Sequence, residues 1–156
     1  MPEFLSNLFD QKQIEFLFQI ILSALLGGFI GLEREYRQKP AGFRTHLLVS
    51  VGSTLFTILS IEAFRNFGGA LTDPSRVASN ILTGIGFIGA GAILHHEDRV
   101  VGLTTAAGLW LTAAIGMAVG TRFYTLAVAT TFIIIGTYFV SRILLDFLRK
   151  VFHKLR

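Results

Sequence analysis

A charged segment between two apolar stretches holds the residue types best suited to chemistry. Its candidate side chains, four charged and one hydroxyl, lie within about a dozen positions of one another: Glu33, Arg34, Arg37, Arg44 and Thr45. Glu33 stands four residues before Arg37, the favourable order for an ion pair on a helix. The segment predicts a functional polar mouth that binds an ion, a lipid headgroup or a partner. The alternative is a solvated connection that sets topology and pairs its own charges.

The ends of the two helices flanking this segment predict a specific contact. Glu33 and Glu35 stand at the carboxyl end of the first helix and Arg44 at the amino end of the second, so each opposes the dipole of its own helix. We therefore expect Arg44 to contact Glu33 or Glu35.

Within the apolar stretches the polar groups are uncharged. Candidate intramembrane polar residues are Asn80, Thr83, Thr104 and Thr105. Threonine hydroxyls commonly bond to their own helix backbone, whereas the amide of Asn80 cannot be satisfied so locally, and it could line a polar cavity. No carboxylate stands in the middle of a stretch, which argues against a proton relay or a cation pump.

Glycine residues recur within several of the apolar stretches. Gly84 to Gly89 spell G-x-G-x-x-G, but the apolar surroundings and the lack of an acidic residue about 20 positions later argue against a dinucleotide site. Close packing of membrane helices explains these small residues better. The candidate packing glycines are Gly27, Gly31, Gly84, Gly86, Gly89 and Gly91.

Enzymatic and metal sites find little support. There is no cysteine, and no nucleophile, base or metal triad stands at catalytic spacing, so we expect no catalytic residues and no enzyme. The run from His95 to Asp98 could attract a divalent ion, although a solvated loop fits it better. No cofactor is expected, and direct magnesium binding stays open.

Composition places these residues in a membrane protein. Of 156 residues, 52% are hydrophobic and 15% charged, and the basic residues border apolar runs, so nucleic acid is a poor partner. Five stretches are long enough to cross a bilayer. We predict one all-α domain over 1–156, a polytopic five-helix transmembrane bundle with spans near 14–32, 45–63, 77–95, 101–120 and 123–145, followed by a basic cytoplasmic tail over 146–156. The short connection at Gly120 to Arg122 predicts a tight hairpin between the last two spans.

Basic residues predict the orientation. With five spans, ten Lys and Arg residues fall on one side and four on the other. By the positive-inside rule the richer side is cytoplasmic, which places the amino terminus outside and the carboxyl terminus inside.

Three blocks, GLEREYRQKPAGFRTHLLVSVGS, RVASNILTGIGFIGAGAIL and VVGLTTAAGLWLTAAIGMAVG, resemble the MgtC/SapB family of membrane proteins, in a short form without the C-terminal soluble domain of longer members. The resemblance implies a multi-pass protein of the bacterial inner (cell) membrane, linked to magnesium homeostasis or adaptation to magnesium limitation, with the ATP synthase as a possible protein partner. The family motifs fall on Glu33, Arg34, Arg37, Gly42, Arg44 and Thr45, then on Arg76, Gly84, Gly86, Gly89 and Gly91, and then on Gly102, Leu103, Thr104, Thr105, Ala106 and Trp110.

The sequence leaves three possible functions to weigh. We favour a regulator or interaction protein, a homodimer in the lipid bilayer, which suits the absence of buried charge along the spans. The alternative is a small transporter or channel for an ion or small solute, with Asn80 and the threonines lining the path. An intramembrane enzyme ranks last.

Overall fold

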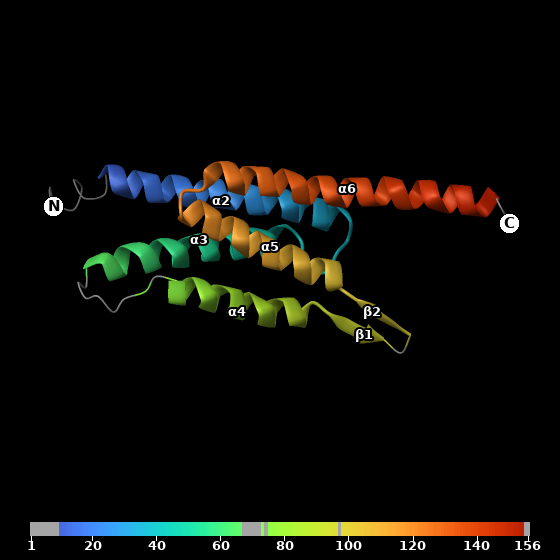
Figure 1. The fold of residues 1–156 in the computed structure, drawn as a ribbon, viewed down its shortest axis with the longest axis horizontal. Helices are drawn as coiled ribbons and strands as arrows, with labels where there is room; N and C mark the ends of the chain where they lie inside the picture. Colours follow the sequence, from blue (N-terminus) through green and yellow to red (C-terminus); the bar gives the residue numbers. More distant parts are fainter. Residues whose placement is uncertain (1–9, 67–72, 74, 97, 155–156) are drawn as a thin grey trace.

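The computed structural model describes residues 10–66, 73, 75–96 and 98–154. Its helices are α2 (Gln11–Tyr36), α3 (Phe43–Asn66), α4 (Ser75–Gly91), α5 (Leu103–Gly120) and α6 (Tyr124–Lys154), and its strands are β1 (Leu94–His96) and β2 (Arg99–Val101). Figure 1 shows the helices running along one long axis, with α4 at one edge and α6 at the other. The all-α architecture expected from the sequence is confirmed at this level, with one small antiparallel hairpin added.

Four helices are long and apolar enough to cross a membrane: α2, α3 over Phe43–Glu62, α5, and α6 over Tyr124–Leu145. They correspond to four of the five expected spans. Helix α4 has 17 residues, a length of about 26 Å against a hydrocarbon core of about 30 Å. The chain is thus a polytopic membrane protein with four candidate spans, and a fifth crossing by α4 stays a prediction.

Two expected boundaries differ from the structure. The range 77–95 was expected to be one helix, but α4 ends at Gly91 and the chain turns into the hairpin, where Leu94 pairs with Val101 and His96 with Arg99. The tail expected from 146 onward is instead helical as far as Lys154, because α6 continues without a break.

Local chemistry explains where the helices end. The Gln38 backbone enters the left-handed region (φ 54°) after α2, and that of Arg122 does so (φ 68°) between α5 and α6, which confirms the tight hairpin. At the start of α4, the Asp73 carboxylate accepts hydrogen bonds from the Ser75 backbone N–H (2.9 Å) and hydroxyl (2.7 Å). These bonds hold the pKa of Asp73 below its usual value, and the anion complements the helix dipole.

The core is shared by α2, α5 and α6. Its buried members are Leu26, Ile30, Ile115, Val119, Ala127 and Ile134. Helix α3 packs against α2 and α5, and α4 packs against α5 and α3. Only Ile85 and Gly89 are buried on α4, so this helix lies at the edge of the bundle.

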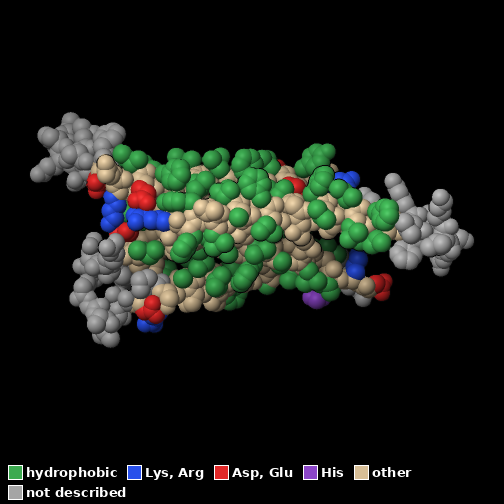
Figure 2. Space-filling model, turned by 45° about the horizontal axis from the view of Figure 1, so that its top comes forward, with side chains coloured by type: hydrophobic (Ala, Val, Ile, Leu, Met, Phe, Trp, Pro, Cys, Tyr) green, Lys and Arg blue, Asp and Glu red, His purple; other side chains and the backbone are tan. Residues whose placement is uncertain are grey.

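Hydrophobic side chains cover the middle of the face seen in Figure 2, and most Lys, Arg, Asp and Glu side chains gather toward its two ends. At one end the ion pairs join helices: Lys12 of α2 pairs with Glu62 of α3, and Arg122 pairs with Glu15 over 2.8 Å. The opposite end carries the segment between α2 and α3, the hairpin and the start of α5. The bundle thus has an apolar middle between two charged ends, as expected for a protein that spans a membrane.

Candidate functional site

A cavity lined by charged side chains lies at the end of the bundle where α2 ends and α5 begins; we call it the mouth cavity. Its volume is about 670 Å³. It is lined by Glu33, Arg34, Arg37, Lys39, Pro40, Val100, Val101, Gly102, Leu103, Thr104, Thr105, Tyr138, Ser141, Arg142 and Leu145. Three of the five residues expected at the polar mouth, Glu33, Arg34 and Arg37, therefore share one cavity, while Arg44 and Thr45 lie outside its lining.

Arg34 is the structural centre of this cavity. It is only 5% exposed, and its Nε donates a hydrogen bond of 2.5 Å to Glu33 Oε2. Its guanidinium carbon lies 3.4 Å from the centroid of the Tyr138 ring on α6. A buried guanidinium needs both charge neutralisation and satisfied donors, and Glu33 and Tyr138 supply an anion and a π face.

Glu33 also pairs with Arg37, whose Nε lies 3.4 Å from Glu33 Oε1. This is the helical i, i+4 pair that the spacing predicts. Glu33 is thus the acceptor for two cations, and the mouth cavity keeps an excess of positive charge.

The expected contact between Arg44 and Glu33 or Glu35 is wrong. The carboxylate of Glu35 instead accepts a hydrogen bond of 2.8 Å from the backbone N–H of Phe43, at the first residue of α3. The anion therefore meets the positive end of the next helix, while Arg44 is exposed and forms no ion pair with either acid. The helix-dipole argument predicted that an acid at the carboxyl end of α2 needs a positive partner. That partner is the backbone N–H of Phe43 and not Arg44.

Helix α5 begins at the mouth cavity. Gly102 adopts φ 97° before the helix, and no side chain caps the first turn. A Cβ on Gly102 would lie 1.9 Å from the carbonyl oxygen of Ala92, so both the conformation and the contact require glycine. Thr104 is exposed and Thr105 buried, and the first turn of α5 forms part of the cavity wall.

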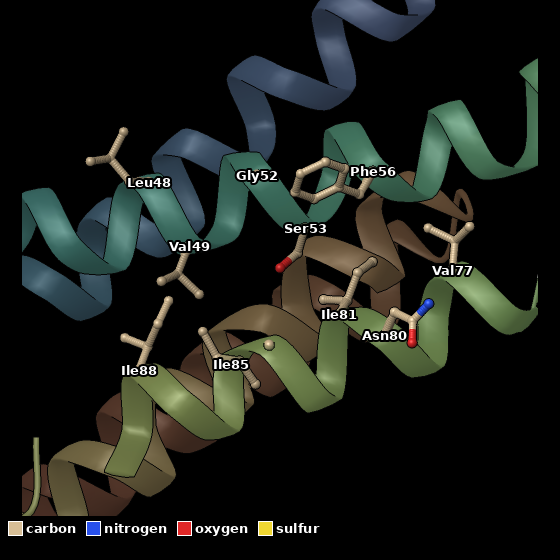
Figure 3. Close-up of a pocket in the computed structure, with 11 residues that line it drawn as sticks. Leu48, Val49, Gly52, Ser53, Phe56, Val77, Asn80, Ile81, Ile85 and Ile88 are labelled. Carbon is tan, nitrogen blue, oxygen red and sulfur yellow. The ribbon is translucent and has the colours of Figure 1, made fainter. Parts of the chain in front are cut away.

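Asn80 and Thr83 lie elsewhere, on the exposed side of α4. Asn80 lines a second, largely apolar groove of about 570 Å³ between α3 and α4 (Figure 3). The Thr83 hydroxyl donates to its own helix at Ser79 O (3.1 Å). The structure therefore does not join these two residues with Thr104 and Thr105 in one path.

Buried polar groups join α2, α3 and α5, and among them the sequence reasoning missed Gln19 and Ser23. Gln19 Nε2 donates to the carbonyl oxygens of Val119 (2.8 Å) and Gly120 (3.2 Å). The Thr54 hydroxyl lies 2.7 Å from Ser23 Oγ and 2.8 Å from Gly116 O, and its single proton is donated to one of these acceptors at a time. The signal was present, since Gln19 is an amide within the first apolar stretch, and the argument applied to Asn80 applies to it equally.

His46 belongs to the same interior. Its Nδ1 lies 2.8 Å from the Thr112 hydroxyl, which itself donates to Gly108 O. That hydroxyl must accept from the imidazole, so Nδ1 carries the proton. Nε2 is buried and has no hydrogen-bond partner among the described residues.

The candidate packing glycines fall into three groups. A Cβ on Gly27 would lie 2.6 Å from Ser50 Cβ, and one on Gly31 would lie 2.6 Å from Phe43 Cα, so both stand at a close crossing of α2 and α3. A Cβ on Gly89 would lie 3.6 Å from Ala106 Cβ, an ordinary van der Waals distance. Gly84, Gly86 and Gly91 would meet nothing within 4 Å, so the described chain gives these three no packing role.

His95 lies on β1, within the hairpin, and not in the helix expected there. Glu97 falls outside the described residues. Among the residues that the structure describes, no three His, Cys, Asp or Glu side chains gather into a metal site.

Comparisons with known proteins agree with this architecture. The model of the MgtC family matches residues 20–147. The chain is 49% identical over 117 residues to a protein of Escherichia coli K12 named "Putative magnesium transporter YhiD", covering 73% of this chain and 54% of that one. It is 40% identical over 131 residues to Protein SapB of Bacillus subtilis, covering 81% and 56%. It is 46% identical over 111 residues to Protein MgtC of Brucella abortus, covering 70% and 44%.

The chain thus spans about half the length of the curated relatives it matches. No solved structure matches it at a significant level. With four candidate spans, a match over most of its length and several relatives above 40% identity, the chain belongs to the MgtC family of membrane proteins.

Proposed function

We propose that this protein is a regulator or interaction protein of the bacterial inner membrane, linked to magnesium homeostasis or adaptation to magnesium limitation. Family membership and the magnesium in the name of one relative support the physiological setting. The observation that carries the mechanism is the contrast between a bundle interior joined by uncharged hydrogen bonds and a charged cavity at one end. Such a molecule presents its chemistry at the membrane surface.

The interior supports regulation over pumping. Ser23, Ser50 and Thr54 bond to one another and to the Gly116 carbonyl, so these groups hold helices together and leave few free to coordinate an ion. Pumps and proton relays depend on buried ionisable groups as stepping stones. Arg34 is buried beside Glu33, but both line the mouth cavity and not the middle of the bundle. His46 is a buried ionisable group of the interior, and its Nδ1 is engaged by the Thr112 hydroxyl.

Growth under magnesium limitation tests the proposal. A bacterium lacking its own MgtC-family gene should regain growth when this chain is expressed, and proteoliposomes containing the purified chain should show no ion flux above empty vesicles. Variants of the mouth cavity should lose growth rescue while still inserting in the membrane. Rescue that persists with Arg37→Gln, Lys39→Gln and Arg142→Gln combined would count against the mouth as the working surface.

The alternative, a small transporter or channel, rests on the groove that holds Asn80. It requires a flux through vesicles that Asn80→Leu abolishes. Leu55→Ala, which alters an exposed apolar residue of α3 outside this groove, is the control. If Asn80→Leu abolishes the flux and Leu55→Ala does not, the protein is a transporter and the regulatory proposal is wrong.

The proposal includes orientation and assembly. The described residues place Arg37, Lys39, Arg44 and Arg142 at one end, while Lys12 and Arg122 are ion-paired at the other, which supports a cytoplasmic mouth under the positive-inside rule. The exposed glycines of α4 offer a surface for close approach of a second copy, which supports a homodimer. An ATP synthase partner rests on the family resemblance.

A further inference from the structure

Two polar side chains from different helices meet beside Gly108, behind the wall of the mouth cavity. A Cβ on Gly108 would lie 2.4 Å from the hydroxyl oxygen of Tyr138 and 3.6 Å from Cε1 of His46. The hydroxyl oxygen and Cε1 are therefore at most about 6 Å apart, the sum of these two distances. Tyr138 comes from α6 and lines the mouth cavity, whereas His46 comes from α3 and lies outside the lining. Glycine at position 108 gives both side chains access to the same place on α5.

The imidazole of His46 offers a hydrogen-bond acceptor at this place. Its Nδ1 carries the proton, because it lies 2.8 Å from the Thr112 hydroxyl, which itself donates to Gly108 O. That partner is a hydroxyl and not a carboxylate, and a buried charge without a counter-ion is costly, so the ring is neutral. Nε2 therefore holds a lone pair that can only accept. His46 is 0% exposed, and Nε2 has no partner among the described residues.

The hydroxyl of Tyr138 offers the matching donor. Its ring stacks on the Arg34 guanidinium, but no hydrogen bond joins the hydroxyl to any residue that the structure describes. The hydroxyl of a buried tyrosine usually finds a partner, and an unpaired polar atom in the interior loses free energy. A donor without an acceptor and an acceptor without a donor thus lie beside the same glycine. One hydrogen bond between them satisfies both.

Tyr138 also stands where α6 needs support. The inward face of this helix carries the buried residues Ala127, Thr131 and Ile134, and Tyr138 follows four residues later on the same face. Every side chain that the structure describes beyond Tyr138 on α6 is exposed. The Tyr138 ring is therefore the last inward contact of α6 in the described chain, and a bond from its hydroxyl to α3 would fix the ring there.

We propose that the Tyr138 O–H donates a hydrogen bond to Nε2 of His46, directly or through one bound water molecule, and that His46 is thereby a positioning residue of the mouth cavity. His46 holds the Tyr138 ring, and the ring holds the Arg34 guanidinium. The contacts then run from Arg34 through Tyr138 and His46 to Thr112. This inference rests on the proposed function only in concerning the same cavity, because it states how the mouth is held together and not what the cell uses it for.

Nitrogen magnetic resonance of the purified full chain, with isotope-labelled histidine rings, tests the hydrogen bond. The His46 signals are those that disappear in His46→Gln. Tyr138→Phe removes the donor and keeps the ring, so the Nε2 resonance of His46 should shift toward that of an acceptor nitrogen without a partner. The matched control is Tyr124→Phe, which removes a hydroxyl that faces Glu15 at the other end of the bundle and should leave the Nε2 resonance in place. Scalar coupling between Nε2 and the phenol proton identifies a direct bond, and magnetisation transfer from water identifies a bridging water.

A second measurement tests the positioning of the ring. The Arg34 Nε–H resonance reports the stacking, because an aromatic ring shifts the resonances of nuclei that lie over its face. His46→Asn keeps a donor near the Thr112 hydroxyl but has no atom at the place of Nε2, whereas the side-chain oxygen of His46→Gln reaches that place. The ring-induced shift of Arg34 should therefore be lost in His46→Asn and largely kept in His46→Gln.

Each outcome decides the question. An Nε2 resonance that Tyr138→Phe leaves unchanged, or that both tyrosine variants shift equally, overturns the hydrogen bond. An Arg34 resonance that is the same in His46→Asn as in the unaltered chain overturns the positioning role. If His46→Asn does not fold, the two tyrosine variants still decide, because both keep the histidine. Growth rescue by a chain without the Nε2 response would refute this inference and leave the proposed function standing, and a confirmed bond without growth rescue would do the reverse.

Discussion

The guanidinium of Arg34 stacks on the ring of Tyr138, with 3.4 Å between the guanidinium carbon and the ring centroid. The contact joins the carboxyl end of α2 to α6, and it lies in a buried environment where a cation over an aromatic face contributes about 2 kcal/mol. It holds the buried Arg34 guanidinium of the mouth cavity in place, so its loss should lower the stability of the protein.

Replacing Tyr138 tests this stacking. Tyr138→Leu removes the π face and should lower the unfolding free energy by about 2 kcal/mol, while Tyr138→Phe keeps the ring and should cost less than about 1 kcal/mol. Thermal unfolding in one detergent measures both. If the two variants lose the same unfolding free energy, the stabilisation comes from the Tyr138 hydroxyl, which lies beside Gly108, and not from the ring.

The sequence was sufficient to predict the membrane class, the helices and the identity of most charged residues at the mouth. Length and lack of charge decide these features locally, as in the stretches that became α2 and α5. The spacing of Gly27 and Gly31 likewise predicted a close crossing, and the structure places Phe43 against Gly31.

The rest depended on partners far apart in the chain. Nothing near Arg34 indicates that Tyr138 will cover it, and nothing near Gly84 indicates that α4 will leave it exposed. Arg44 illustrates the same limit, since the helix dipole predicts that a charge needs a partner but not which one. Glu35 accepts a hydrogen bond from the backbone N–H of Phe43 instead of pairing with Arg44.

Adding a methyl group should distinguish a glycine at a close helix contact, such as Gly116, from an exposed glycine such as Gly84. A Cβ on Gly116 would lie 2.3 Å from the Ser50 carbonyl oxygen, and backbone cannot move aside cheaply. Gly116→Ala should therefore destabilise the protein by about 1–3 kcal/mol. Gly84→Ala meets open space and should be neutral or slightly stabilising in the monomer. Unfolding midpoints of the two variants provide the comparison, and a neutral Gly116→Ala would contradict the packing of α3 on α5.

The interior hydroxyl network can be tested at Thr54. Thr54→Val keeps the shape of the side chain and removes the hydroxyl that lies within hydrogen-bond distance of Ser23 Oγ, the Ser50 carbonyl and the Gly116 carbonyl. At roughly 0.6 kcal/mol for each interhelical bond, the loss should be about 1–2 kcal/mol. The control is Thr137→Val, because the exposed Thr137 hydroxyl donates only to Ile133 O in its own helix. If both variants unfold alike, the network does not hold the helices together.

The proposed orientation can be tested with single cysteines, because the chain contains none of its own. Lys39→Cys lies in the mouth cavity and is exposed, and Lys12→Cys lies near the start of α2 at the other end of the bundle. Positive charge concentrated at the mouth predicts that end to be cytoplasmic. A membrane-impermeant maleimide added to intact spheroplasts should therefore label Lys12→Cys and leave Lys39→Cys unlabelled until the membrane is opened. Labelling of Lys39→Cys in sealed spheroplasts would invert the topology, and labelling of both would place the two ends of α2 on one side and rule out α2 as a span.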